Sequence, residues 1–176
     1  MTMTISNSAS TKFLALAALL GSIPGLGCAS SSPPQTGCTE IGCNDGLTVT
    51  FAPNSGWAPG SYRFVIDIDG QVTTCEGSLP LKDCDAGPSL QCSPATERVR
   101  IGESGCALPP EQQGFSELQI GVPPAASVKI TVSRDGAELV QKTLAPQYKT
   151  SRPNGPDCEP VCQSASESLM IPGATP

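Results

Sequence analysis

The fold of this chain is decided by the stretch SYRFVIDIDGQVTTCE, residues 61–76. Four apolar side chains alternate along its first half and share one face of a strand: Tyr62, Phe64, Ile66 and Ile68. Asp69-Gly70 follows, and this dipeptide favours the two-residue turn of a β-hairpin because both central positions adopt positive φ. The returning segment is rich in β-branched residues, which are enriched in strands. We therefore predict an antiparallel hairpin over residues 61–76.

The same pattern recurs in residues 127–143, where a second alternating segment turns at Asp135-Gly136 and returns. Shorter alternating segments occupy residues 47–51, 99–101 and 118–122. Glycine and proline number 18 each, which is typical of many short strands joined by turns, and we predict no helix. The expected fold is all-β: a disulfide-stapled antiparallel β-sandwich of about seven strands. At this level the chain resembles immunoglobulin-like and fibronectin-like domains, with Trp57 as a candidate core aromatic.

The chain holds nine cysteines, and eight of them follow residue 37: Cys38, Cys43, Cys75, Cys84, Cys92, Cys106, Cys158 and Cys162. Eight cysteines allow about a hundred pairings, and the sequence does not select one. Spacing suggests that Cys84 and Cys92 close a local loop, that the close pairs at the two ends of the domain join those ends, and that Cys75 bonds Cys106. Aromatic residues make up only 4% of the chain, whereas each disulfide contributes about 2–4 kcal/mol. We therefore expect cross-links, rather than a thick apolar core, to hold the fold.

The amino-terminal residues have the layout of a secretory signal peptide, since an apolar run over residues 13–27 follows Lys12 and ends in small residues. The motif Gly25-Leu26-Gly27-Cys28 resembles the lipobox of bacterial lipoproteins, with its leucine one step later than is usual in that family. The resemblance implies that Cys28 becomes the first mature residue and carries a thioether-linked diacylglycerol. Ala29 in the next position implies the outer membrane of a Gram-negative cell. The alternatives are a permanent anchor helix and soluble secretion after a cut near Cys28.

The parity of the cysteines agrees with lipidation, because removing Cys28 from the count leaves an even set for four disulfides in an oxidising compartment. The predicted organisation is a lipoprotein signal peptide over residues 1–27, a lipidated Ser/Pro-rich tether over 28–37, a single β-sandwich domain over 38–164 and a flexible tail over 165–176.

Charge and composition exclude several classes of function. The net charge is −6, and without the leader the chain keeps 9 basic and 16 acidic groups, a net charge of −7. Nucleic acid is not an expected partner, because phosphate binding needs clustered Lys and Arg, and the nearest approach to a cluster is Arg98 with Arg100. The chain has no histidine, which rules out serine–histidine and cysteine–histidine catalysis.

Two carboxylate pairs remain as candidates for chemistry: Asp67 with Asp69, and Asp83 with Asp85. Paired acids can hydrolyse glycosides when one is desolvated, and Asp67-x-Asp69-Gly70 offers oxygens to calcium; an ordinary solvated turn is the simpler interpretation. The close pairs Cys38-x4-Cys43 and Cys158-x3-Cys162 would suit zinc only as thiolates. We expect disulfides there, and neither a metal site, a cofactor nor catalysis.

The most unusual stretch is YKTSRPNGPDCEPVC, residues 148–162, a dense Pro/Gly loop that suits either a recognition surface or a cap on the last strand. Together with the leader and the cysteine density, its ending resembles small cysteine-rich envelope lipoproteins of the myxobacterial type. We expect a lipid-anchored, non-enzymatic envelope protein, attached to the membrane through its lipid, that binds an unidentified protein or glycan or acts structurally. A secreted disulfide-rich effector or inhibitor-like module is the alternative, and a carboxylate-dependent glycan-active enzyme comes third.

Overall fold

The computed structural model of the protein describes residues 37–172. They form ten strands: β1 Gly46–Pro53, β2 Gly60–Ile68, β3 Gln71–Leu79, β4 Gln91–Ser93, β5 Val99–Ser104, β6 Gly114–Ile120, β7 Val128–Arg134, β8 Ala137–Leu144, β9 Lys149–Ser151 and β10 Cys162–Ile171. Two single-turn 3₁₀ helices, η1 Cys84–Ala86 and η2 Pro110–Gln112, lie in loops. No helix in this part of the chain is long and apolar enough to cross a membrane.

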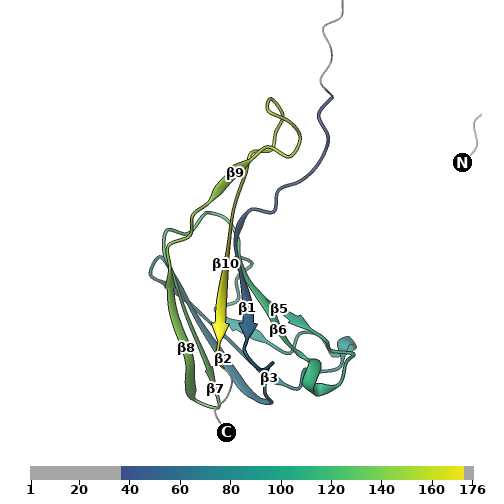
Figure 1. Cartoon of the computed structure of the whole chain (residues 1–176), viewed down its shortest axis with the longest axis vertical. Coiled ribbons are helices and arrows are strands. Elements are labelled where there is room, and N and C mark those ends of the chain that lie inside the picture. Colours follow the sequence, from purple (N-terminus) through teal and green to yellow (C-terminus); the bar gives the residue numbers. More distant parts are fainter. Residues whose placement is uncertain (1–36, 173–176) are drawn as a thin grey trace, which may run out of the picture. The chain divides into compact units, whose positions relative to one another are not determined.

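The strands form two five-stranded sheets, in the orders β5-β6-β1-β10-β9 and β4-β3-β2-β7-β8. The predicted all-β, disulfide-stapled sandwich is confirmed (Figure 1). All seven predicted strands are present, and β4, β9 and β10 are added to them. β4 and β9 have three residues each, too few to show a period. One neighbouring pair, β1 with β10, is parallel, whereas the sandwich was expected to be antiparallel throughout.

The predicted flexible tail is wrong over residues 165–171, because these residues complete β10. β10 lies inside its sheet, between β1 and β9. Its buried positions include Cys162 and Ala165, and its exposed face carries several serines, so the contrast between apolar and polar positions is weak. The folded domain therefore extends beyond the expected boundary at residue 164.

The core is larger than composition suggests, because five aromatic side chains gather in one cluster: Phe51, Trp57, Tyr62, Phe64 and Phe115. Trp57 contacts the other four rings, with centroid distances of 5.1–6.3 Å, and its indole N–H donates to the carbonyl of Phe115 at 2.9 Å. Leucine, isoleucine and valine side chains from both sheets complete the core. The expectation of a thin core is therefore wrong: an apolar core and cross-links occur together.

Both predicted hairpins are confirmed, with turns at Asp69-Gly70 and Asp135-Gly136. Their first strands, β2 and β7, pair antiparallel, so that the turn of each hairpin lies beside the start of the other. Asp69, at φ 52°, exchanges hydrogen bonds with the backbone of Ser127, and Asp135, at φ 50°, does so with Ser61. The two turns are therefore related by a local two-fold axis, and each aspartate ties one hairpin to the other.

Candidate functional site

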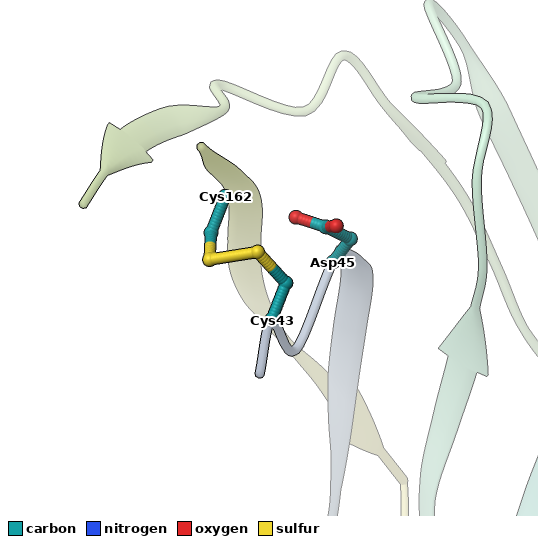
Figure 2. A group of neighbouring side chains, drawn as sticks. All are labelled: Cys43, Asp45 and Cys162. Atoms are coloured by element: carbon teal, nitrogen blue, oxygen red, sulfur yellow. A yellow bond between two sulfur atoms is a disulfide. The ribbon is translucent and has the colours of Figure 1, made fainter. Parts of the chain in front are cut away.

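The two ends of the domain are joined covalently where the described chain begins. Disulfides link Cys38 to Cys158 and Cys43 to Cys162, at sequence separations of 120 and 119 residues. The predicted joining of the ends is thus confirmed, and Figure 2 shows the second bridge at the start of β10. We call residues 38–45 and 152–163 together the terminal clamp. Its parts meet because β1 and β10 are parallel neighbours, which brings the segments preceding both strands to the same end of the sheet.

Asn154 is the polar centre of the terminal clamp, and only 8% of its surface is exposed. Its Oδ1 accepts hydrogen bonds from the Thr39 hydroxyl at 2.7 Å and the Ile41 N–H at 2.8 Å. Its Nδ2 donates to the carbonyl oxygens of Ile41 at 3.0 Å and Glu159 at 2.7 Å. One side chain therefore holds the amino-terminal segment against the loop before β10, and a buried amide with all these partners is well satisfied.

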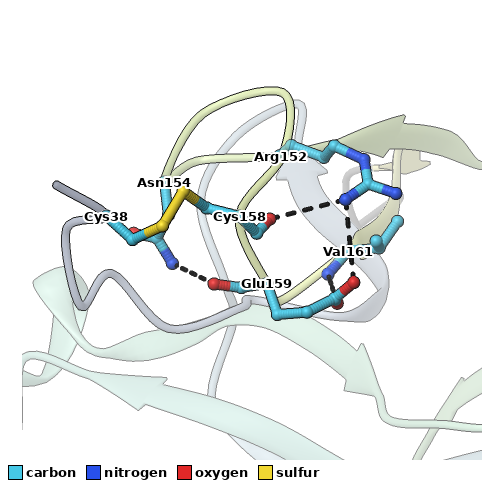
Figure 3. A network of polar contacts seen from close by, with 6 residues as sticks. All are labelled: Cys38, Arg152, Asn154, Cys158, Glu159 and Val161. Atoms are coloured by element: carbon cyan, nitrogen blue, oxygen red, sulfur yellow. Dashed lines mark hydrogen bonds and ion pairs between the residues drawn. A yellow bond between two sulfur atoms is a disulfide. The ribbon is translucent and has the colours of Figure 1, made fainter. Parts of the chain in front are cut away.

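The loop before β10 also holds its own shape (Figure 3). The Arg152 guanidinium lies 3.7 Å from the Glu159 carboxylate and donates to the Cys158 carbonyl at 3.5 Å. The same carboxylate accepts the N–H of Val161 at 3.1 Å. Of the two predicted roles for residues 148–162, these contacts are those of a cap on the last strand.

Asp45 lies beside the Cys43–Cys162 disulfide, and the two sulfurs and a carboxylate oxygen fall within 4.8 Å of one another (Figure 2). This grouping does not favour a metal, because the sulfurs are bonded to each other and are not thiolates. The Asp45 carboxylate instead accepts the backbone N–H of Gln163 at 2.5 Å. Asp45 is therefore a further link between the two segments of the terminal clamp, beside the two disulfides and Asn154.

The two predicted carboxylate pairs have different surroundings in the structure. Asp67 accepts the N–H of Gly70 at 2.8 Å, within its own turn. The Asp69 carboxylate accepts the N–H groups of Ala126 and Ser127. Asp85 lies in η1 and Asp83 directly precedes it, and both are exposed. The first pair thus has the turn-stabilising role that was the simpler interpretation.

At the end of the sandwich opposite the terminal clamp, the loops 80–90 and 105–113 are held together. The disulfide Cys84–Cys106 joins them. The buried Gln113 side chain accepts the Leu81 N–H at 2.6 Å and donates to the Leu108 carbonyl at 2.8 Å.

The fourth disulfide, Cys75–Cys92, joins directly opposite residues of β3 and β4. The suggested pairs Cys84–Cys92 and Cys75–Cys106 are therefore wrong. The register of β3 with β4 places Cys92 opposite Cys75, and Cys84 and Cys106 then pair across the two loops.

A hollow of about 780 Å³ lies along the open side of the sandwich, between the edge strands β4 and β5. Much of its polar lining is already paired internally. Glu103 accepts the N–H groups of Ser89 and Leu90, and Arg98 donates to the carbonyl of Pro123 at 2.8 Å. Ligand pockets usually present a few convergent polar groups that are free to bind, and the groups paired here do not meet that description.

One ionisable group in the core is perturbed. Burial among apolar neighbours raises the pKa of Tyr62 above its usual value of 10.0. Its hydroxyl donates to the Ala58 carbonyl at 2.7 Å. Tyr62 is therefore a structural, neutral tyrosine at the edge of the aromatic cluster.

The predicted lipidation residue, Cys28, lies outside the described residues. Sequence analysis missed Asn154 and Asp45, the two polar residues that organise the terminal clamp. The only sequence signal for Asn154 is its place in the Pro-Asn-Gly-Pro run, which favours a turn rather than a buried amide.

Four disulfides indicate an oxidising, exported environment. Comparison with protein-family models, curated proteins and solved structures finds no match.

Proposed function

We propose that this protein is a non-enzymatic module of the bacterial cell envelope, held to a membrane by a lipid on Cys28. The observation that supports this most directly is the pairing of the cysteines. Every cysteine other than Cys28 is bonded to another described cysteine. The ninth cysteine thus stands at the one place where the sequence resembles a lipobox, and it is not needed for any cross-link of the domain.

The roles of the carboxylates support a binding or structural part over an enzymatic one. Hydrolysis by paired acids needs one carboxyl group with a raised pKa and a second that stays ionised. Asp67 and Asp69 instead accept backbone N–H groups and so have structural roles at a turn. The domain therefore offers stable surfaces more readily than a proton-transfer site.

The surface that such a module would present lies at the end opposite the terminal clamp. Strands β1 and β10 both begin at the clamp and run away from it, so the loops after β1, β3 and β5 gather at the far end (Figure 1). The bridge between Cys84 and Cys106 and the Gln113 side chain fix two of these loops. Preorganised loops lose little entropy on binding, and Leu108, 49% exposed, offers an apolar contact among them. We propose this end as the binding face for a protein or glycan.

Mass spectrometry of the amino-terminal peptide tests the anchor directly. The full-length chain is expressed in a Gram-negative host and the membrane fraction is digested. We expect a peptide that begins at Cys28 and carries the mass of a diacylglycerol, and we expect the intact mass to show the loss of eight thiol hydrogens. A mature chain that begins at another residue, or that begins at Cys28 without lipid, would contradict the proposal and favour soluble secretion.

Two variants accompany this measurement. Cys28→Ala is expected to lose the acyl mass, whereas Ser31→Ala, a matched change in the tether, is expected to keep it. Enzymatic activity is tested on the purified domain with a glycan library. Turnover that disappears in Asp67→Asn or Asp83→Asn would overturn the non-enzymatic assignment without affecting the anchor.

A further inference from the structure

We propose that the terminal clamp is a tension bypass, which passes a pull on the segment before Cys38 directly into β10 and leaves the rest of the domain unloaded. The inference rests on the proposed anchoring for its biological use and concerns a pull between that tether and the segment after β10; a pull on the binding face proposed above would pass through the sheets. Its physical basis is the covalent path through the described residues, which is independent of lipid.

Two covalent routes lead from Cys38 to the start of β10. One crosses the Cys38–Cys158 bridge and follows the chain to Cys162. The other follows the chain to Cys43 and crosses directly to Cys162. Residues 44–157 belong to neither route. A pull between the two ends of the domain therefore reaches β10 without passing through β1 to β9, and either bridge alone is enough.

The remaining element on the path is β10, and it is already extended. A strand rises about 3.3 Å per residue, and a fully stretched chain reaches at most about 3.6 Å per residue. The ten residues of β10 can therefore lengthen by only about 3 Å in total. Eight residue pairs of parallel ladder with β1 keep the strand in register with the sheet as it is pulled.

One cysteine of each clamp bridge is shielded from solvent. Cys158 and Cys162 are only 6% and 5% exposed, whereas Cys38 is exposed and Cys43 is half-buried, and thiol–disulfide exchange requires access to a sulfur. The hydrogen bonds of Asn154 and Asp45 hold both segments over the two bridges. The bridges Cys75–Cys92 and Cys84–Cys106 span only 17 and 22 residues and lie off the path. They stabilise the fold without carrying a pull between its ends, so they provide a matched control.

Optical-tweezers measurements on the full mature chain, with handles joined to tags before residue 37 and after residue 176, test the bypass. We expect the oxidised protein to show no unfolding step before the handles detach. Addition of a reductant under constant force should produce a step of about 400 Å, because 120 residues are released at about 3.4 Å each. A step of that size in the oxidised protein would overturn the proposal.

Alanine pairs locate the effect. Removing the control pair (Cys75→Ala with Cys92→Ala), or either clamp pair alone, should leave the long step absent. Removing both clamp pairs should restore a step of about 330 Å without reductant, because the intact Cys84–Cys106 bridge, with a sequence separation of 22 residues, keeps its own loop closed. The reduction arm uses the unaltered protein, so the test stands even where the variant lacking both bridges fails to fold. A long step in a single-pair variant would refute the redundancy of the two routes. The two proposals can fail separately. An unfolding step in the oxidised protein would overturn the bypass and say nothing about the lipid on Cys28, and a chain without lipid would leave the bypass intact.

Discussion

Asp69 provides the sharpest test of how the two hairpins are held together. Its carboxylate accepts the N–H of Ser127 at 2.8 Å and that of Ala126 at 3.1 Å, while its own N–H donates to the Ser127 carbonyl at 3.1 Å. Its backbone lies in the left-handed region, at φ 52°. The hydrogen bonds accepted by the side chain and the left-handed backbone conformation therefore contribute separately to the free energy of unfolding, and substitutions can distinguish the two contributions.

The magnitudes follow from this geometry. Asp69→Gly keeps the backbone conformation and removes both side-chain hydrogen bonds, each worth about 1 kcal/mol at an exposed turn, so we expect a loss of about 2 kcal/mol. Asp69→Ala adds the cost of a left-handed alanine, about 1 kcal/mol, for a total of about 3 kcal/mol. Asp69→Asn keeps an acceptor and tolerates the conformation, so its loss should stay below about 1 kcal/mol.

Urea unfolding with the disulfides intact measures these free energies at neutral pH. The matched residue is Asp135, which occupies the equivalent turn at φ 50° and accepts the N–H of Ser61 at 2.8 Å. The same order, Asn above Gly above Ala, should appear at both positions, with smaller losses at Asp135, whose carboxylate accepts a single backbone N–H. A glycine variant as stable as the wild type, or an asparagine variant as unstable as alanine, would refute the assignment of the stability to these bonds.

Three further outcomes follow from buried contacts. Asn154→Asp replaces two donated hydrogen bonds with carboxylate oxygens facing carbonyls, so unfolding free energy should fall by about 2–3 kcal/mol, read by urea titration. In Gly114→Ala the new Cβ would clash with the Trp57 ring, so the emission of the single tryptophan should shift to the red and stability should fall by about 2–4 kcal/mol. The raised pKa of Tyr62 means that the neutral side chain stabilises the fold below pH 10, and that this contribution is lost as pH rises through the pKa of the folded state. Phenylalanine cannot ionise, so the urea midpoint of Tyr62→Phe should decline less above about pH 10.

The strands that alternate strongly were predictable from sequence, and the weakly alternating ones were not. In β2, bulky apolar residues occupy the buried face at Tyr62, Phe64 and Ile66, so period and turn chemistry agree. In β10 the buried positions include the small Ala165, and serines fill much of the rest. Its position is imposed by pairing with β1, a contact between segments more than 110 residues apart, and no local pattern records such a contact.

The candidate site was predictable only as far as spacing allowed. Close cysteine pairs at both ends of the domain indicated that the ends are joined, but the partners inside the domain depend on register. Cys75 and Cys92 lie opposite each other because β3 and β4 pair, and β4 is too short to be seen in the sequence. Asn154 was missed for a related reason: its burial results from the amino-terminal segment that packs over it.

The two clamp bridges are interleaved along the chain, and this arrangement makes a quantitative prediction about how they share their stabilisation. The first bridge to form closes a loop of about 120 residues, which lowers the entropy of the unfolded chain by about 5 kcal/mol in the loop-closure description. The second then closes a ring of only roughly 11 residues, those between the paired cysteines, and adds about 3 kcal/mol. Removing either pair as alanines should thus cost about 3 kcal/mol, because the other bridge still closes the long loop, whereas removing both should cost about 8 kcal/mol. Urea unfolding of the two single-pair variants and the combined variant measures all three losses. A single-pair loss of 5 kcal/mol, with the combined loss equal to the sum, would mean that the bridges act independently and that unfolded-chain entropy is not their main contribution.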